Sequence, residues 1–141
     1  MLFRSLDLEI TESMVMHNVD AGMLAVNRLR DIGLRLSIDD FGTGYSSLSY
    51  LQKFPVDTLK VDRSFIHEII ANSDYAPIVS AVISMGKSLN HRVIAEGVET
   101  REQLAFLQAR QCREGQGYYF SPPLDAEEFA SLLRTDVPPP S

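Results

Sequence analysis

Short stretches with strand periodicity alternate with helical stretches along the whole chain, and this alternation constrains the fold more than any other feature. Five strands are predicted, at residues 6–10, 34–39, 58–62, 92–96 and 116–120. Helices are predicted at residues 20–32, 46–54, 63–70, 75–89, 101–110 and 126–134. Because strands that alternate with helices form a parallel sheet with right-handed crossovers, the sequence predicts an α/β fold.

Helix ends and buried helix faces are also predicted from the sequence. Asp20 is the predicted N-cap of the helix at residues 20–32, and Gly33 is its predicted C-terminal stop. Two capping boxes are predicted, Thr100 with Gln103 and Asp125 with Glu128. The predicted apolar stripes are Ala25, Leu29 and Ile32 on the helix at residues 20–32, and Ile78, Val82, Met85 and Leu89 on the helix at residues 75–89.

The composition is that of one soluble globular domain. The chain has 141 residues, of which 45% are apolar and 23% are charged. The net charge of −6 argues against a protein that binds DNA or RNA polymers, because such proteins carry a basic surface. A small phosphate substrate held through metal ions remains compatible with this charge.

The sequence also bears on the compartment. Cys112 is the only cysteine, so an internal disulfide is excluded and a reducing, cytoplasmic location is expected. No apolar run approaches the roughly 20 residues that cross a membrane, so no membrane contact is expected of this segment. Asp7 and Glu9 interrupt the apolar start, which argues against a signal peptide.

Two adjacent carboxylates, Asp39 and Asp40, end the second predicted strand. A loop with Gly42 and Gly44 follows, and these glycines allow the loop to fold back over the strand end. Carboxylates in this position suit a hard divalent cation such as Mg²⁺, which takes oxygen ligands. A solvated turn at the same residues is the open alternative.

Charged residues stand near the carboxyl ends of four predicted strands, each in phase with the polar face of its strand: Glu9, Asp39, Lys60 and Glu96. Parallel α/β folds place their functional sites at this edge. Three acidic strand ends and a lysine suit one or two Mg²⁺ or Mn²⁺ ions, which can promote phosphodiester hydrolysis. Lys60 could hold the attacking water or neutralise phosphoryl charge. The open alternatives are a Lys60 that only forms salt bridges and four unrelated solvated strand ends.

Other features of the sequence carry less functional information. His17, His67 and His91 share no metal-binding spacing and are expected at the surface. The aromatic residues 118–120 are expected to pack in the core rather than to stack on a base. A phosphoacceptor domain would also use an acidic pair, a hydroxyl and a lysine, but carboxylates from this many strands exceed what such a site needs.

Five motifs resemble those of the EAL domain family and occur in the family's order and spacing. They are LEITES at residues 8–13, DDFGTGYSS at 39–47, LKVDRSF at 59–65, AEGVE at 95–99 and QGY at 116–118. The resemblance runs from about residue 6 to residue 133. It implies a TIM-like (β/α) barrel that hydrolyses the bacterial messenger cyclic di-GMP to linear pGpG, using two Mg²⁺ or Mn²⁺ ions.

The resemblance implies roles for the charged residues at the strand ends. Glu9, Asp39 and Asp40 are expected to bind the metals, with Asp39 bridging the two ions and Asp40 on the second ion. Glu96 is expected to be a further metal-site carboxylate and a general base. Lys60 is expected to contact the attacking water.

Three more residues take roles from the same resemblance. Gln116 is expected near the metal-bound water. Glu12 is expected to support the loop at residues 39–47, whose position couples to metal binding and dimerisation. Glu99 is expected just outside the metal ligands.

Two features of the family are absent from this chain: the Glu-Ala-Leu motif and an asparagine that supplies another metal ligand. Both would lie before Met1. Residues 1–135 are therefore expected to be the C-terminal portion of an EAL domain, a partial TIM-like barrel with about five parallel strands. Residues 136–141 are expected to be a disordered, proline-rich tail.

These expectations extend to activity and partners. The intact parent is expected to be a cyclic di-GMP phosphodiesterase that follows a GGDEF or sensory domain, through which it could be membrane-anchored. The portion itself is expected to be inactive alone, and a non-catalytic cyclic di-GMP receptor is the open alternative. The reading frame before Met1 would distinguish the two. Open strand edges are expected to pair with another copy and give a homo-oligomer.

Overall fold

A five-stranded parallel sheet forms the centre of the computed structural model, which describes residues 6–43, 52–72 and 74–135. The strands lie in the sheet in chain order: β1 (Asp7–Thr11), β2 (Arg35–Phe41), β3 (Thr58–Val61), β4 (Arg92–Glu96) and β5 (Glu114–Gln116). All four neighbouring pairs are parallel. The predicted α/β fold with five parallel strands is confirmed.

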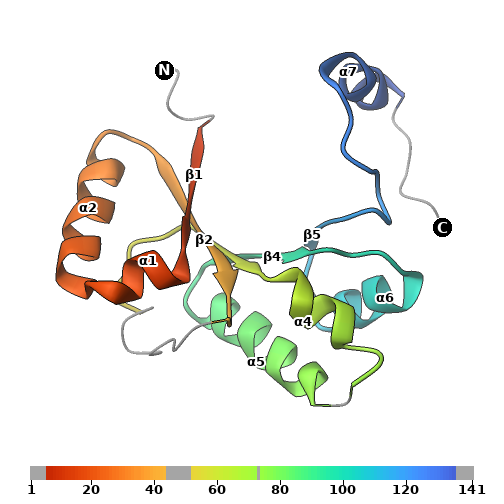
Figure 1. Cartoon of the computed structure of the whole chain (residues 1–141), viewed down its shortest axis with the longest axis horizontal. Coiled ribbons are helices and arrows are strands. Elements are labelled where there is room, and N and C mark those ends of the chain that lie inside the picture. The colour runs from red at the N-terminus through yellow and green to blue at the C-terminus, as the bar shows by residue number, and fades with distance from the viewer. Residues whose placement is uncertain (1–5, 44–51, 73, 136–141) are drawn as a thin grey trace.

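Helices connect the strands and extend the chain after β5 (Figure 1). They are α1 (Glu12–His17), α2 (Val19–Asp31), α4 (Arg63–Glu68), α5 (Tyr75–Ser88), α6 (Arg101–Ala109) and α7 (Ala126–Arg134). None of these described helices is long and apolar enough to cross a membrane. The predicted helix at residues 46–54 and the predicted tail at residues 136–141 lie wholly or mostly outside the described residues.

One face of the sheet carries apolar side chains at alternate positions and packs against the helices. Leu36, Ile38 and Leu59 are fully buried and form one cluster with residues such as Val26 of α2. A second cluster joins β3 and β4 to α4, α5 and α6: Val61, Ala95, Ile66, Val79, Ile83 and Leu107. The alternation therefore directs the intervening polar residues to the opposite face of the sheet.

That opposite face carries charged pairs. Near the start of the strands, Arg35 Nε lies 2.8 Å from Asp7 Oδ1, and Arg92 pairs with Glu114. Closer to the carboxyl ends of the strands, the same face presents Glu9 on β1 and Lys60 on β3. The face therefore carries charged residues near the starts of the strands as well as near their carboxyl ends.

The predicted fifth strand was placed too late in the sequence. The strand is Glu114–Gln116, and residues 118–120 form a turn in which the Phe120 N–H donates to Gly117 O. A Cβ atom at Gly117 would lie 2.2 Å from Val98 O, so only glycine permits this close approach of two backbones. The β-propensity of the aromatic residues suggested a strand where this contact turns the chain.

The predicted N-cap of α2 was wrong, whereas its C-terminal stop is confirmed. The Asn18 side chain accepts the Ala21 N–H at 3.1 Å and caps the helix, and Asp20 lies in the first turn. Gly33 has a φ of +88° and donates its N–H to Arg30 O. The capping boxes of α6 and α7 are both confirmed.

The predicted apolar stripes of α2 and α5 are confirmed in part, because Leu29, Val82, Met85 and Leu89 pack partly buried against the core without being the most buried residues. On α2, Val26 is buried while Ala25 and Ile32 are exposed. On α5 the buried residues are Val79, Ile83 and Gly86, whereas Ile78 is 44% exposed. A Cβ atom at Gly86 would lie 2.3 Å from Val93 Cγ2, so this glycine brings α5 close to β4.

Candidate functional site

Lys60 joins the carboxyl ends of β1, β2, β3 and β4. It lies on β3 and is only 6% exposed. Its Nζ atom lies 2.7 Å from Glu9 Oε1, 2.7 Å from Glu96 Oε1 and 3.7 Å from Asp39 Oδ1. The structure therefore brings together the four strand-end residues named from the sequence.

The surroundings of Lys60 favour its charged form. Burial by itself would lower the pKa of Lys60, but hydrogen bonds to Glu9 and Glu96 outweigh burial and raise it. Burial raises the pKa of Glu96, while the ammonium group of Lys60 acts in the opposite direction. The pair thus combines a permanent positive charge with a carboxyl group that binds a proton more readily than usual.

A β-bulge places Asp39 and Asp40 at one site. The register of β2 against β3 shifts between Ile38 and Phe41, and Asp40 has a φ of +55°. Consecutive residues of a regular strand would point to opposite faces, and the bulge removes this restriction. As a result, one carboxylate oxygen from each of Asp39, Asp40 and Glu96 lies within 4.8 Å of the others.

This trio of carboxylates suits a divalent cation. Mg²⁺ and Mn²⁺ prefer oxygen ligands, and Mg²⁺ commonly binds through one or two carboxylates together with water and phosphate oxygens. Partial burial and repulsion from Asp39 and Asp62 raise the pKa of Asp40, as expected where negative charges are concentrated. The donor chemistry therefore fits the metal that the sequence predicted.

Asp62 belongs to the same region and is a site residue that was not predicted from the sequence. Its carboxyl group lies close enough to Asp40 for the two groups to shift each other's pKa, raising that of Asp40. Asp62 Oδ1 also accepts the Ser64 N–H at 2.9 Å and the Ser64 hydroxyl, so it caps α4. Although burial opposes the effect, these bonds lower the pKa of Asp62. Its position directly after β3, like the position of Asp40 at the end of β2, was the available signal.

Glu12 lies beneath the loop that follows Asp40. It is 1% exposed, and its Oε2 atom accepts the Gly42 N–H at 2.9 Å. Gly42 has a φ of +101°, which disfavours other residues at this position. Gly44 and the remainder of the predicted loop, residues 45–47, lie outside the described residues. The contact is compatible with the predicted support of the loop by Glu12.

Gln116 and Glu99 lie around the edge of the site. Gln116 ends β5 in register with Glu96 and is exposed. Glu99 lines a separate pocket of about 480 Å³ with Arg63, Ser64 and His67. The structure therefore places Gln116 beside the carboxylate cluster and Glu99 in a neighbouring pocket, and their predicted roles remain predictions.

The histidines and aromatic residues follow their predictions in part. His17 and His67 are exposed, but His91 is half-buried because it follows α5 against the start of β4. Tyr119 and Phe120 pack against the apolar cluster that includes Val98, whereas Tyr118 is 68% exposed. The predictions were therefore wrong for His91 and for Tyr118.

Comparisons with known proteins agree on one family. The family model described as EAL domain matches residues 2–123. Cyclic di-GMP phosphodiesterase NbdA of Pseudomonas aeruginosa is 51% identical over 138 residues, which cover 96% of this chain and 18% of NbdA. The bifunctional diguanylate cyclase/cyclic di-GMP phosphodiesterase MucR of the same species is 47% identical over 126 residues, covering 89% of this chain and 18% of MucR.

Solved structures give the same result for the fold. The structure of PaMucR phosphodiesterase in complex with c-di-GMP has a TM-score of 0.88 at 46% identity, covering 90% of this chain and 51% of that one. The EAL domain of Mycobacterium smegmatis DcpA has a TM-score of 0.86 at 42% identity, covering 96% and 61%. The chain thus spans about half to three fifths of these structures, and less than a fifth of NbdA and of MucR.

Proposed function

This chain belongs to the EAL domain family, whose members fold as TIM-like barrels, and we propose that its charged edge is part of a metal-dependent site that hydrolyses cyclic di-GMP to linear pGpG. The observation that carries the proposal is the convergence of Lys60 with carboxylates from β1, β2 and β4. The printed names of NbdA and MucR, both cyclic di-GMP phosphodiesterases, support the same substrate.

Metal ions have a defined place in this proposal. Asp39, Asp40 and Glu96 would hold one Mg²⁺ or Mn²⁺ ion, and Glu9 would join Asp39 in holding a second. Bound there, such ions would polarise the phosphodiester and lower the pKa of a water molecule. The carboxylates would otherwise repel a dianionic substrate, so metal should be required for binding as well as for turnover.

Lys60 and Glu96 would handle charge and protons at the reacting phosphate. Lys60 is held in place by two hydrogen bonds of 2.7 Å, so its charge is already positioned where negative charge would develop. The raised pKa of Glu96 makes it a better proton acceptor than an ordinary glutamate. Gln116, in register with Glu96, would orient the water through its side-chain amide.

A chimera tests the catalytic competence of these residues. The matched 138 residues of NbdA would be replaced by this chain, and pGpG formation would be measured by chromatography with Mn²⁺. We expect the chimera to hydrolyse cyclic di-GMP, and we expect Asp39→Asn or Lys60→Met to abolish turnover. Asp7→Asn is the matched control, since it removes a carboxylate charge from the same sheet face near the strand starts.

Two outcomes would contradict the proposal. A folded chimera that binds cyclic di-GMP without turnover would favour the receptor alternative. Equal loss of activity in Asp7→Asn and Asp39→Asn would show that general charge on the sheet face matters, rather than the cluster. Circular dichroism would establish that each variant is folded.

For the 141-residue chain by itself, we propose metal-dependent nucleotide binding with little hydrolysis, because a second ion would have only Glu9 and Asp39 as ligands among the described residues, an incomplete set. Its location is proposed to be the cytoplasm, where a reduced Cys112 is expected. Pairing through the free edges of β1 and β5 remains a proposal, supported by their terminal positions in the sheet.

A further inference from the structure

Two glycines directly follow residues of the proposed site at the carboxyl edge of the sheet. Gly97 follows Glu96 at the end of β4, and Gly117 follows Gln116 at the end of β5. Both have positive φ angles, of +69° and +155°, which other residues rarely adopt. At each glycine, a neighbouring segment also occupies the space that a side chain would need.

Gly97 lies against Arg63, the first residue of α4. A Cβ atom at Gly97 would lie 2.6 Å from Arg63 Cβ and 3.3 Å from Arg63 Cα. Nonbonded carbon atoms are normally about 3.5–4.0 Å apart, so an alanine here would push the two segments apart by about 1 Å. Because Arg63 Cβ is bonded directly to the backbone, rotation of the side chain does not relieve this contact. The absence of a side chain at Gly97 therefore lets the end of β4 lie close to the start of α4.

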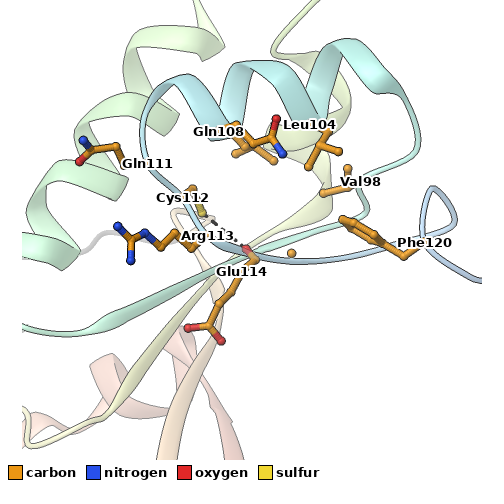
Figure 2. Close-up of a pocket in the computed structure, with 10 residues that line it drawn as sticks. Val98, Leu104, Gln108, Gln111, Cys112, Arg113, Glu114 and Phe120 are labelled. Carbon is orange, nitrogen blue, oxygen red and sulfur yellow. Dashed lines mark hydrogen bonds between the residues drawn. The ribbon is translucent and has the colours of Figure 1, made fainter. Parts of the chain in front are cut away.

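The loop that follows β4 is held on its other side by β5 and the turn after it. Val98 donates its N–H to Gln116 O at 3.0 Å, and Val98 O accepts the Tyr119 N–H at 2.9 Å. A Cβ atom at Gly117 would lie 2.2 Å from Val98 O. The Val98 side chain lies beside Phe120 on the wall of a pocket of about 410 Å³ (Figure 2). The loop is thus fixed between α4 and the end of β5, so a displacement at Gly97 would pass to the end of β4.

We propose that Gly97 is a positioning residue for the metal site, because it determines where Glu96 lies. This inference rests on the proposed function. Glu96 Oε1 lies 2.7 Å from Lys60 Nζ, and a Glu96 oxygen lies within 4.8 Å of oxygens of Asp39 and Asp40. The distances between a metal ion and its ligands must be correct to within about 0.2 Å. A shift of about 1 Å next to Glu96 would therefore separate this carboxylate from the other two.

Calorimetric titration with Mn²⁺ tests this role. Gly97→Ala should weaken Mn²⁺ binding by about tenfold or more, while circular dichroism shows a folded chain. Gly33→Ala is the matched control, because Gly33 also has a positive φ, of +88°, but a Cβ atom there would meet nothing within 4 Å. This control strains the backbone without a new contact and should bind Mn²⁺ as the unmodified chain does. Unchanged affinity in Gly97→Ala, or equal weakening in Gly33→Ala, would overturn the proposal.

A double variant keeps the test decisive if Gly97→Ala does not fold. Arg63→Gly removes the Cβ atom that the new alanine would contact. Gly97→Ala combined with Arg63→Gly should therefore fold and recover most of the Mn²⁺ affinity. A double variant that stays unfolded, or that binds Mn²⁺ as weakly as Gly97→Ala, would show that the contact with Arg63 does not position the site.

A metal-free measurement separates this inference from the proposed function. A double-mutant cycle of Lys60→Met and Glu96→Gln, measured by urea unfolding, should show coupling between these residues in the unmodified chain and a smaller coupling in the Gly97→Ala background. If the unmodified chain binds no Mn²⁺ but the coupling still falls, the proposed metal site is wrong and the positioning of Glu96 is supported. Coupling that Gly97→Ala leaves unchanged would refute the positioning role.

Discussion

Lys60 Nζ and Glu96 Oε1 lie 2.7 Å apart across neighbouring strands, and both side chains are largely buried, at 7% and 15% exposure. This is the length of a strong charge-assisted hydrogen bond. The contact ties β3 to β4 at the edge where the carboxylates gather, so the same pair bears on both stability and the proposed chemistry.

Removing the charge of Lys60 should destabilise the fold. We expect Lys60→Met to lower the free energy of unfolding by about 2 kcal/mol, since it leaves Glu96 buried without its positive partner. Urea unfolding would measure this loss, and added Mn²⁺ should recover part of it by supplying positive charge. In the control Arg35→Met, which breaks an exposed pair, the loss should stay below about 1 kcal/mol. Equal losses would show that the Lys60 contacts contribute no more than a surface pair.

The carboxylate trio should control metal affinity. We expect Asp39→Asn or Asp40→Asn to weaken Mn²⁺ binding at least tenfold, because each variant removes the charge of one of the three converging carboxylates. Loss of a residue that only hydrogen-bonds to a metal ligand already weakens metal binding by about tenfold or more. Calorimetric titration of the chain with Mn²⁺ would measure the affinity. Asp7→Asn should bind Mn²⁺ as the unmodified chain does, and a similar weakening in that variant would contradict a local site.

Much of the site follows from strand periodicity. Lys60 and Glu96 are in phase with the polar faces of β3 and β4, and parallel strands bring their carboxyl ends to one edge. The pairing of Asp39 with Asp40 does not follow from periodicity, because a regular strand would separate them. The bulge that unites them depends on the register of β2 against β3, which is a tertiary property.

The errors in the predicted fold have a similar origin. Asn18 and Asp20 are both good N-caps, and the turn between α1 and α2 determines which one acts. The most buried face of α5 was not predicted, because it includes Gly86, a residue that is not counted as apolar and that lies against Val93. The end of β5 is likewise determined by a backbone contact, in which Gly117 lies close to Val98. Such contacts between distant segments leave no periodic signal.

The Glu12 carboxylate should be required for the geometry next to Asp40. We expect Glu12→Leu to lower the free energy of unfolding by about 2 kcal/mol and to weaken Mn²⁺ binding, because the Gly42 N–H loses its acceptor. Glu12→Gln retains an acceptor oxygen and should have a smaller effect on both quantities. Urea unfolding and calorimetry would measure them, with Glu102→Leu, at an exposed position of α6, as the control. Unchanged Mn²⁺ affinity in Glu12→Leu would show that the Glu12–Gly42 contact does not influence metal binding.

His91 should make stability depend on pH in the weakly acidic range. Burial lowers the pKa of His91 below its usual value of about 6.5, although a hydrogen bond with the Val56 backbone and the nearby Asp57 partly oppose burial. In the unfolded chain this histidine gains its proton near that usual value, whereas in the folded chain it resists protonation until the pH is lower. Between these two values the unfolded state binds more protons, so stability rises with pH and is lost as pH falls below about 6.5.

We expect His91→Gln to flatten the curve of unfolding free energy against pH in this window, measured by urea unfolding at several pH values. His67→Gln is the matched control, because the His67 side chain is 70% exposed, and it should leave the slope unchanged. If His91→Gln retains the full slope, other groups must produce the pH dependence.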